Sequence, residues 1–560
     1  MESKFSINYR KTKKLNLEKV ASTDACEDAY NPFDIASMQS YTPLYNRFFE
    51  MDETNYNKIT LNNTYQIRDL STVYKNEEIV EKNIFVKFSP LIDPLNFLRG
   101  KYNLETEITR TLPTINSTET IMPKLLDVNN SAYVDGFFSY LTSMLKDTHG
   151  WVHGVEYYGS YLGIQKKFKY NIADDLEFVS NCSFFLNNIN KHFTIDEEAS
   201  QILNQYSGEG SRRNRNKLCI EDSDVALDVE ELLCDEPVET VETMSPINLE
   251  YENICTNNVV ESDSSGSDSS GSDSECTGSG SDSDDEESVW ETESDDSESG
   301  DSESGESIFE DDDEPIFSYL NNYPVQMIFQ EKCTGTIDEL IMRRKLNDEQ
   351  FMDALMQIML ILATYQKLFN FTHNDLHTNN IMYVETDIEF LYYKLEGVFY
   401  KVPTHGRIYK LIDFGRAIYK FNNKLFCSDS FAPLGDASTQ YNCEPYFNEK
   451  KPRVDPNPSF DLCRLGCSMF DFVCRSGDPK TPLQKLVDHW CNDDYGKSML
   501  YRHNGQTRYP DFKLYKMIAR TVNNLVPKDE LKTLVFATKY AFTPDANTVV
   551  MDIDSLPVYV

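Results

Sequence analysis

Four polar side chains lie at a spacing that could support chemistry. His373, Asp375 and Asn380 lie in the run HNDLHTNN, and Asp413 follows 33 residues after Asn380 in the run DFG. A carboxylate can accept a proton, and carboxylate and amide oxygens are ligands that Mg²⁺ prefers. In a structural alternative, Asp375 and Asn380 cap a turn while Asp413 opens a β-turn with Gly415. The residues therefore allow either a proton-accepting site with a divalent cation or a pair of ordinary turns.

The order of these residues resembles the catalytic core of protein kinases. A helix predicted over 349–369 comes first, and the HNDLHTNN loop, a β-hairpin and the DFG motif follow. The turn interpretation would require all these motifs to coincide by chance. The resemblance implies that Asp375 accepts the proton of a substrate hydroxyl and that Asn380 and Asp413 bind Mg²⁺. It places His377 at a position that contacts the nucleotide phosphates.

Flanking segments extend the resemblance in both directions. Lys87 lies in the β-rich run 83–89 and resembles the third-strand lysine that binds the α- and β-phosphates of ATP. Glu331 and Cys333, in QEKCTGTI, look like the hinge whose backbone binds adenine. Asp461, in SFDLCRLGC, resembles an aspartate that anchors the catalytic loop, which is a structural role.

The third-strand lysine of a kinase needs an acidic partner from a helix. Residues 131–146 place Tyr133, Phe137, Tyr140, Leu141 and Met144 near one face, as expected for an amphipathic helix. Asp135 lies in this helix and is the candidate partner of the lysine. The alternative is that Asp135 is an exposed helix carboxylate.

A longer run resembles one particular group of protein kinases. Residues 391–418, LYYKLEGVFYKVPTHGRIYKLIDFGRAI, resemble serine/threonine protein kinases of large DNA viruses of the mimivirus type. The resemblance covers roughly residues 80–195 and 315–540. It implies a bilobal α+β kinase fold, with a small β-rich lobe and a larger helical lobe. It also implies an ATP and Mg²⁺ site and protein hydroxyls as substrates.

Several positions depart from the usual kinase pattern. No glycine precedes Gly100, so the glycine-rich loop that covers the phosphates is absent. Asn374 replaces the arginine that pairs with a phosphorylated activation loop, which argues against control by such phosphorylation. His377 stands where protein kinases have a lysine, whereas small-molecule phosphotransferases of the aminoglycoside and choline kind have a histidine nearby.

The charge of the chain is concentrated in one segment. The 560 residues carry a formal net charge of −39, but 35 of the 92 acidic residues lie in 218–314, which contains no Lys or Arg. The remaining chain has 57 acidic and 53 basic residues, a net charge of −4. Within 261–314, 18 serines alternate with 23 acidic residues, a composition typical of a disordered segment and of acidophilic phosphorylation sites. A solubilising spacer is the alternative.

These observations predict a domain organisation. We expect a polar N-terminal arm over 1–50, a small lobe over 51–195 and a disordered acidic insertion over 196–314, between the fourth and fifth strands of that lobe. The last strand of the small lobe and the hinge should occupy 315–345, and the helical lobe 346–560. The small lobe should fold without the insertion, because β-rich segments flank it.

Cysteine use and hydropathy indicate the compartment. The thirteen cysteines contain no CxxC pair, and the Cys463 and Cys467 spacing favours packing in a helix over zinc binding. The sequence shows no signal-peptide segment, and its most apolar stretch, 351–371, is interrupted by polar residues such as Asp353, which favours an amphipathic helix over a membrane span. We therefore expect a soluble protein with free thiols, in a host cytoplasm or virion if it is viral. No nucleic-acid motif is visible.

The leading hypothesis is an ATP- and Mg²⁺-dependent kinase that phosphorylates serine and threonine hydroxyls of proteins. One alternative is a pseudokinase that acts as an interaction scaffold, motivated by the missing glycine-rich loop. Another is a small-molecule phosphotransferase of kinase-like fold, motivated by His377. The sequence identifies neither the substrate protein nor the oligomeric state.

Overall fold

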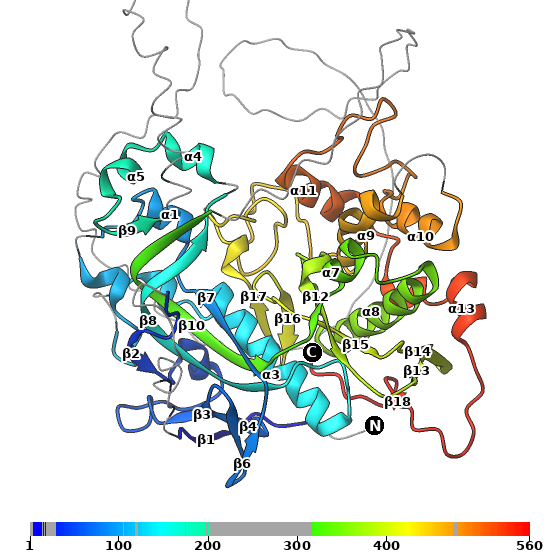
Figure 1. Cartoon of the computed structure of the whole chain (residues 1–560), viewed down its shortest axis with the longest axis horizontal. Coiled ribbons are helices and arrows are strands. Elements are labelled where there is room, and N and C mark those ends of the chain that lie inside the picture. The colour runs from blue at the N-terminus through cyan, green and yellow to red at the C-terminus, as the bar shows by residue number, and fades with distance from the viewer. Residues whose placement is uncertain are drawn as a thin grey trace, which may run out of the picture. The chain divides into compact units, whose positions relative to one another are not determined.

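The computed structural model describes most of the chain outside the acidic segment. The described residues are 4–13, 15, 17, 30–104, 106–117, 121–173, 175–196, 200, 316–474 and 479–560. They form a mixed α and β structure with several small sheets and one curled, half-barrel sheet (Figure 1). The acidic insertion predicted over 196–314 lies outside the described residues, apart from Asp196 and Ser200.

The curled sheet is antiparallel and is built around two fifteen-residue strands. Its strand order is β2-β8-β10-β7, and β9 also pairs with β10. The strands are β2 (Ile35–Gln39), β7 (Ile84–Pro90), β8 (Tyr157–Asn171), β9 (Phe193–Ile195) and β10 (Phe317–Glu331). The aromatic and aliphatic residues between Tyr323 and Phe329 of β10 are buried, which is expected for a central strand covered on both faces. Lys87 of β7 is opposite Ile328 of β10.

Helix α3 (Ser131–His149) packs against this sheet, where the sequence predicts a helix over 131–146. The Asn130 side chain accepts the N–H of Ala132 at its start, and Gly150 ends the helix in the left-handed conformation with φ of 67°. Close approach to β10 requires Gly136, because a Cβ atom there would lie 2.3 Å from Gln326 Nε2. This approach brings the neighbouring Asp135 toward β7.

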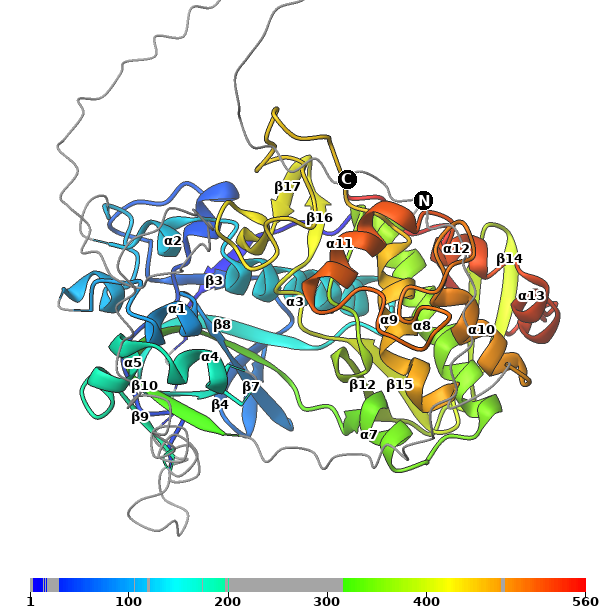
Figure 2. The same cartoon turned by 90° about the horizontal axis from the view of Figure 1, so that it is seen from above.

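The second half of the chain is mainly helical and surrounds α8 (Asp348–Phe369). In the views of Figures 1 and 2, α8 to α13 lie on one side and the curled sheet on the other. A capping box between Asn347 and Gln350 starts α8, and Asn370 ends it with φ of 50°. The helices of this half are α7 (Ile337–Met342), α9 (Phe460–Val473), α10 (Pro482–Trp490), α11 (Phe512–Thr521), α12 (Pro527–Glu530) and α13 (Leu534–Tyr540).

The remaining strands form smaller sheets. Sheet β11-β12-β15 flanks α8 and precedes the DFG motif, β13-β14 forms a hairpin extended by β18, and β16-β17 is a hairpin after DFG. Their strands are β11 (Gly335–Thr336), β12 (Ile381–Glu385), β13 (Phe390–Leu395), β14 (Val398–Pro403), β15 (Arg407–Leu411), β16 (Ile418–Phe421), β17 (Lys424–Cys427) and β18 (Met551–Asp552). Nearer the N-terminus are β1 (Tyr9–Lys11), β3 (Ile59–Leu61), β4 (Tyr65–Asp69), β5 (Thr72–Lys75) and β6 (Glu78–Glu81). Short helices are α1 (Pro94–Leu98), α2 (Pro123–Leu126), α4 (Leu176–Ser180) and α5 (Ser183–Asn188).

Two local expectations differ from the structure. The segment 1–50, predicted to be a polar arm, contributes β2 to the curled sheet through its pairing with β8. Helix α8, predicted to be amphipathic, is buried on nearly every side. Its Asp353 is 1% exposed and accepts hydrogen bonds from Lys539 Nζ at 2.7 Å and Tyr540 Oη at 2.5 Å. These partners compensate the loss of water around the carboxylate, so a polar side chain can be buried at this position.

The cysteines and helices agree with the compositional expectations. The described cysteines are free thiols, and Cys463 and Cys467 are both buried in α9. Within the described residues, no helix is long and apolar enough to cross a lipid bilayer.

Candidate active site

Three charged side chains from distant parts of the sequence meet beside the curled sheet. Lys87 Nζ in β7 lies 2.6 Å from Asp135 Oδ2 in α3 and 2.8 Å from Asp413 Oδ1, which follows β15. The Asp135 side chain is 3% exposed, whereas the Asp413 side chain is 48% exposed. Lys87 therefore joins a buried carboxylate to one that reaches solvent.

The two carboxylates fix the charge state of this cluster. Burial acts to lower the pKa of Lys87, but Asp135 and Asp413 outweigh it and raise that pKa above its ordinary value. Burial acts to raise the pKa of Asp413, but Lys87 outweighs it and lowers that pKa to about 2. Lys87 is therefore a cation and Asp413 an anion at neutral pH.

Asp135 also binds the backbone of the DFG motif. Its Oδ1 accepts the main-chain N–H of Phe414 at 2.9 Å. The Phe414 ring packs on Phe138 of α3 at 4.7 Å and on His373 at 5.7 Å between ring centres. Helix α3, the DFG segment and the loop that contains Asp375 thus form one packed unit.

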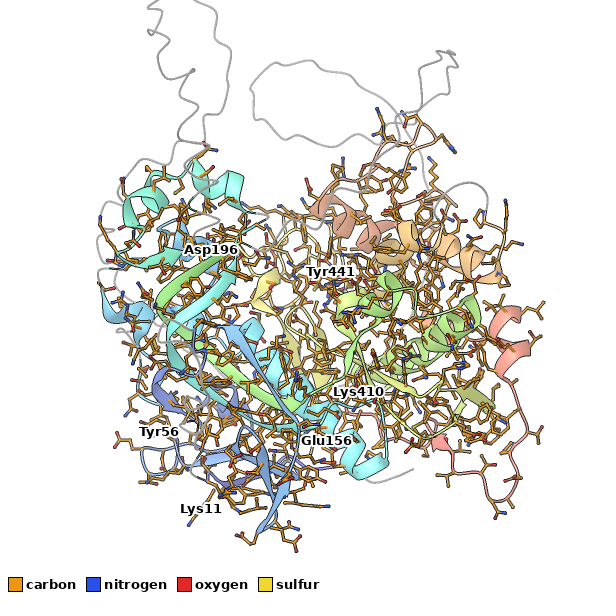
Figure 3. All side chains as sticks on the ribbon, in the orientation of Figure 1. Lys11, Tyr56, Glu156, Asp196, Lys410 and Tyr441 are labelled. Atoms are coloured by element: carbon orange, nitrogen blue, oxygen red, sulfur yellow. The ribbon has the colours of Figure 1, made fainter. Side chains whose placement is uncertain are left out.

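Asp461 of α9 binds the main chain of the loop that contains Asp375. Its two carboxylate oxygens accept the main-chain N–H groups of His373 and Asn374, each at 2.9 Å. Asp461 is fully buried, and burial raises its pKa. Asn374 has a φ of 65°, a strained conformation that these bonds and a 2.8 Å bond from Tyr441 Oη to Asn374 Oδ1 stabilise. Tyr441 is labelled in Figure 3.

The loop brings Asp375, His377 and Asn380 together. Asn380 Nδ2 donates to the main-chain oxygen of Asp375 at 2.9 Å and to His377 Nε2 at 3.1 Å. Both amide hydrogens are used in this way, so Oδ1 is the atom of Asn380 that remains for a metal ion. Burial lowers the pKa of His377, which favours its neutral form.

Two residues that the sequence analysis did not identify contact the Asp375 carboxylate. Tyr515 Oη in α11 donates to Asp375 Oδ1 at 2.8 Å, and Arg416 Nη1 lies 3.5 Å from Asp375 Oδ2. Arg416 directly follows the DFG motif, so the sequence alone could have identified it as a cation near the site. Tyr515 is 140 residues from Asp375, and no sequence pattern links the two.

Glu331 is the last residue of β10, about 10 Å along the strand from Ile328, which is opposite Lys87, and Cys333 follows two residues after the strand ends. The Glu331 carboxylate is mostly buried, where it binds the buried Lys410 of β15 and accepts the N–H of Glu156 at 2.8 Å. Figure 3 labels Lys410 and Glu156. The carboxylate is therefore a structural group. Any contact between this segment and a nucleotide would come from its main chain.

Among the described residues, the main-chain N–H of Cys333 remains available for such a contact. The N–H groups of Glu331, Lys332 and Thr334 bond to main-chain oxygens of Glu156, Asn83 and Tyr383. In the part of the chain that the structure describes, Cys333 N–H has no such partner. Burial raises the pKa of the Cys333 thiol to about 12, so the thiol is neutral.

The described residues contain no ready-made metal cage. No group of three or more His, Cys, Asp or Glu side chains within them is arranged to hold a metal ion. Asn380 and Asp413 instead offer two oxygen ligands, which fits a Mg²⁺ ion that takes its other ligands from phosphates and water.

A cavity of about 1100 Å³ lies elsewhere, among residues of β8, β9 and β10. Its lining includes Lys166, Lys167 and Lys191 but none of the predicted site residues. The cavity is therefore separate from the candidate site. Comparison with models of known protein families and with curated proteins finds no match to this chain.

Proposed function

We propose that this chain is an ATP- and Mg²⁺-dependent protein kinase that transfers the γ-phosphate to serine and threonine hydroxyls of proteins. The observation that carries the proposal is the contact of Lys87 with both Asp135 and Asp413, at 2.6 and 2.8 Å. These residues come from three segments separated by 48 and by 278 positions, and the kinase resemblance predicted all three for one site. A pair of unrelated turns would have no reason to place them together.

The proposed roles follow from the contacts of each residue. Asp375 accepts the proton of the attacking hydroxyl, and the bond from Tyr515 orients its carboxylate. Lys87 binds the α- and β-phosphates, and the main-chain N–H of Cys333 binds adenine. Asn380 and Asp413 hold Mg²⁺, which when bound neutralises phosphate charge.

The proposal includes a bilobal kinase fold. In it, β7, β10 and β8 are adjacent strands of the small lobe, and α3 is the helix that supplies the acidic partner of the lysine. The segment after β10 is the hinge, and α8 to α13 belong to the large lobe. The acidic segment then enters the small lobe between β9 and β10.

One observation favours a pseudokinase as the second candidate. No glycine precedes Gly100, so the glycine-rich loop whose main-chain N–H groups attract phosphates is absent. The intact set of Asp375, Asn380 and Asp413 favours the active kinase.

A transfer assay separates the two candidates. Purified full-length chain is incubated with labelled ATP, Mg²⁺ and generic protein substrates, beside Asp375→Asn, Asp413→Ala and Asp387→Asn. Asp387 is an exposed residue of the loop before β13 and serves as the matched control. We expect transfer by the wild type and by Asp387→Asn, and a loss of at least about 100-fold in the two site variants. Wild-type transfer no greater than that of Asp375→Asn would refute the proposal.

A further inference from the structure

The loop that carries Asp375 contains no lysine or arginine. Its two histidines bind neutral groups through Nε2. His373 Nε2 lies 2.9 Å from the main-chain oxygen of Ile412, and His377 Nε2 accepts an N–H of Asn380 at 3.1 Å. A phosphoryl group that leaves ATP carries negative charge on its three outer oxygens, and a cation beside it stabilises the transition state. This cation has to come from outside the loop.

Arg416 is the cation that forms an ion pair with Asp375 among the described residues. The separation of Nη1 from Asp375 Oδ2 is 3.5 Å, which is longer than the 2.7–2.9 Å typical of a strong charged hydrogen bond. Arg416 makes a shorter ion pair through its other terminal nitrogen, Nη2, which lies 2.6 Å from Asp436 Oδ2. Asp436 thus anchors the guanidinium while Nη1 stays available next to the proton acceptor.

The position of Arg416 in the chain limits where its charge can act. It lies three residues after Asp413, so the two Cα atoms are at most about 10 Å apart. Its guanidinium lies 5.8 Å from the centre of the Tyr515 ring, whose hydroxyl binds Asp375. Only 26% of the Arg416 side chain is exposed, so solvent screens its charge less than that of a surface arginine. The guanidinium therefore lies beside the proton acceptor, on a residue that follows the proposed metal ligand by three positions.

We infer that Arg416 is a catalytic residue whose guanidinium contacts the transferred phosphoryl group, an inference that rests on the proposed kinase function. In the reaction the substrate hydroxyl oxygen forms a bond to the γ-phosphorus. The bond from that phosphorus to the β-phosphate oxygen breaks, and ADP leaves with its electron pair. The hydroxyl proton passes to Asp375. Arg416 stabilises the negative oxygens of the phosphoryl group during this exchange.

The competing explanation is that Arg416 only ties the segment after DFG to Asp436. In that case removal of Asp436 should have the same effect as removal of Arg416. A lysine at another position near Asp375 should not compensate for the loss of the arginine. Position 377 offers such a place, because His377 bonds to Asn380 beside Asp375.

The test measures initial rates of the full-length chain with Mg-ATP and a protein substrate. The variants are Arg416→Met, Arg416→Lys, Asp436→Asn and the double variant Arg416→Met with His377→Lys. Arg453→Met is the matched control, because Arg453 is half-exposed and pairs with Glu444 at 2.5 Å. Thermal shift with Mg-ATP reports whether each variant folds and binds nucleotide.

We expect Arg416→Met to lower kcat by about 100-fold or more while the KM for ATP changes less than about threefold. Arg416→Lys should keep more than a tenth of kcat, and the added lysine at position 377 should restore at least about tenfold to the methionine variant. The inference is overturned if Arg416→Met loses no more activity than Arg453→Met. It is also overturned if Asp436→Asn matches Arg416→Met and the lysine restores nothing. Absence of transfer by the wild type would instead refute the kinase proposal itself.

Discussion

Replacement of Lys87 by methionine tests the charge arrangement at the centre of the site. Lys87 contacts Asp135 at 2.6 Å and Asp413 at 2.8 Å. Without the lysine, the Asp413 carboxylate still reaches water, since 48% of it is exposed, but Asp135 at 3% exposure is left buried without a counter-ion. The destabilisation of Lys87→Met should therefore come almost entirely from Asp135.

Protonation of Asp135 sets the upper limit of this destabilisation. A carboxyl group with an ordinary pKa of about 3.9 can be protonated at a cost of about 4 kcal/mol at pH 7 and about 1.5 kcal/mol at pH 5. Burial already raises the pKa of Asp135, and loss of Lys87 raises it further. The N–H bond from Phe414 still stabilises the anion. We expect Lys87→Met to lose about 2–4 kcal/mol at pH 7 and no more than about 1.5 kcal/mol at pH 5.

The sign of the pH dependence follows from the same pKa values. In the variant, the folded-state pKa of Asp135 lies above that of the unfolded chain. The folded state then binds more protons than the unfolded state at a pH between these values, so the folded state loses stability as the pH rises. The difference between wild type and Lys87→Met should therefore grow from pH 5 to pH 7.

Urea unfolding followed by circular dichroism at both pH values measures this difference. The set comprises wild type, Lys87→Met, Asp135→Asn and their double variant, with the exposed Lys450→Met as control. The double variant should be more stable at pH 7 than Lys87→Met, because no buried charge remains. Equal destabilisation of Lys87→Met at pH 5 and pH 7, or a double variant no more stable than Lys87→Met, would refute the reasoning.

Three further outcomes are expected. Asp461→Ala removes the acceptor of two buried main-chain N–H groups, and urea unfolding should show a loss of about 2–4 kcal/mol, with less than about 1 kcal/mol contradicting the anchoring role. Gly154→Ala should be less thermostable than Gly136→Ala, since the new Cβ would lie 2.1 Å from the fixed main-chain oxygen of Thr142 rather than 2.3 Å from a side-chain nitrogen; the reverse order would contradict this packing. Nucleotide should raise the thermal midpoint only with Mg²⁺ present, and an equal shift in excess chelator would contradict the proposed metal ligands.

Local patterns were sufficient for the elements that position the site. The apolar spacing over 131–146 predicted α3, β-rich composition over 83–89 predicted β7, and a strand expected within 315–345 corresponds to β10. Such patterns work here because each element buries residues at a regular period along the chain. The same logic failed for α8, whose polar Asp353 suggested a solvent-facing side but lies inside the protein with partners from α13.

Contacts between distant segments could not be predicted in the same way. The sequence left two interpretations of Asp135 open, a partner of Lys87 or an exposed carboxylate. Nothing in the sequence shows which helix residue approaches Lys87. The bond from Tyr515 to Asp375 depends on how α11 packs beside the loop, a tertiary feature with no sequence pattern. The burial of the Glu331 carboxylate likewise depends on Lys410, which lies 79 residues away.

If the chain binds ATP, the charges gathered at the site predict that a divalent cation binds with it. Within the contacts of the described residues, four carboxylates face two cations. The carboxylates are those of Asp135, Asp375, Asp413 and Asp436, and the cations are Lys87 and Arg416. Asp135 and Asp413 take two of the three N–H donors of Lys87, so one remains for a phosphate, and the Asp413 carboxylate, which is 48% exposed and ionised at neutral pH, repels that phosphate. A metal ion on Asp413 can compensate that charge and release Lys87, so nucleotide and metal should bind together.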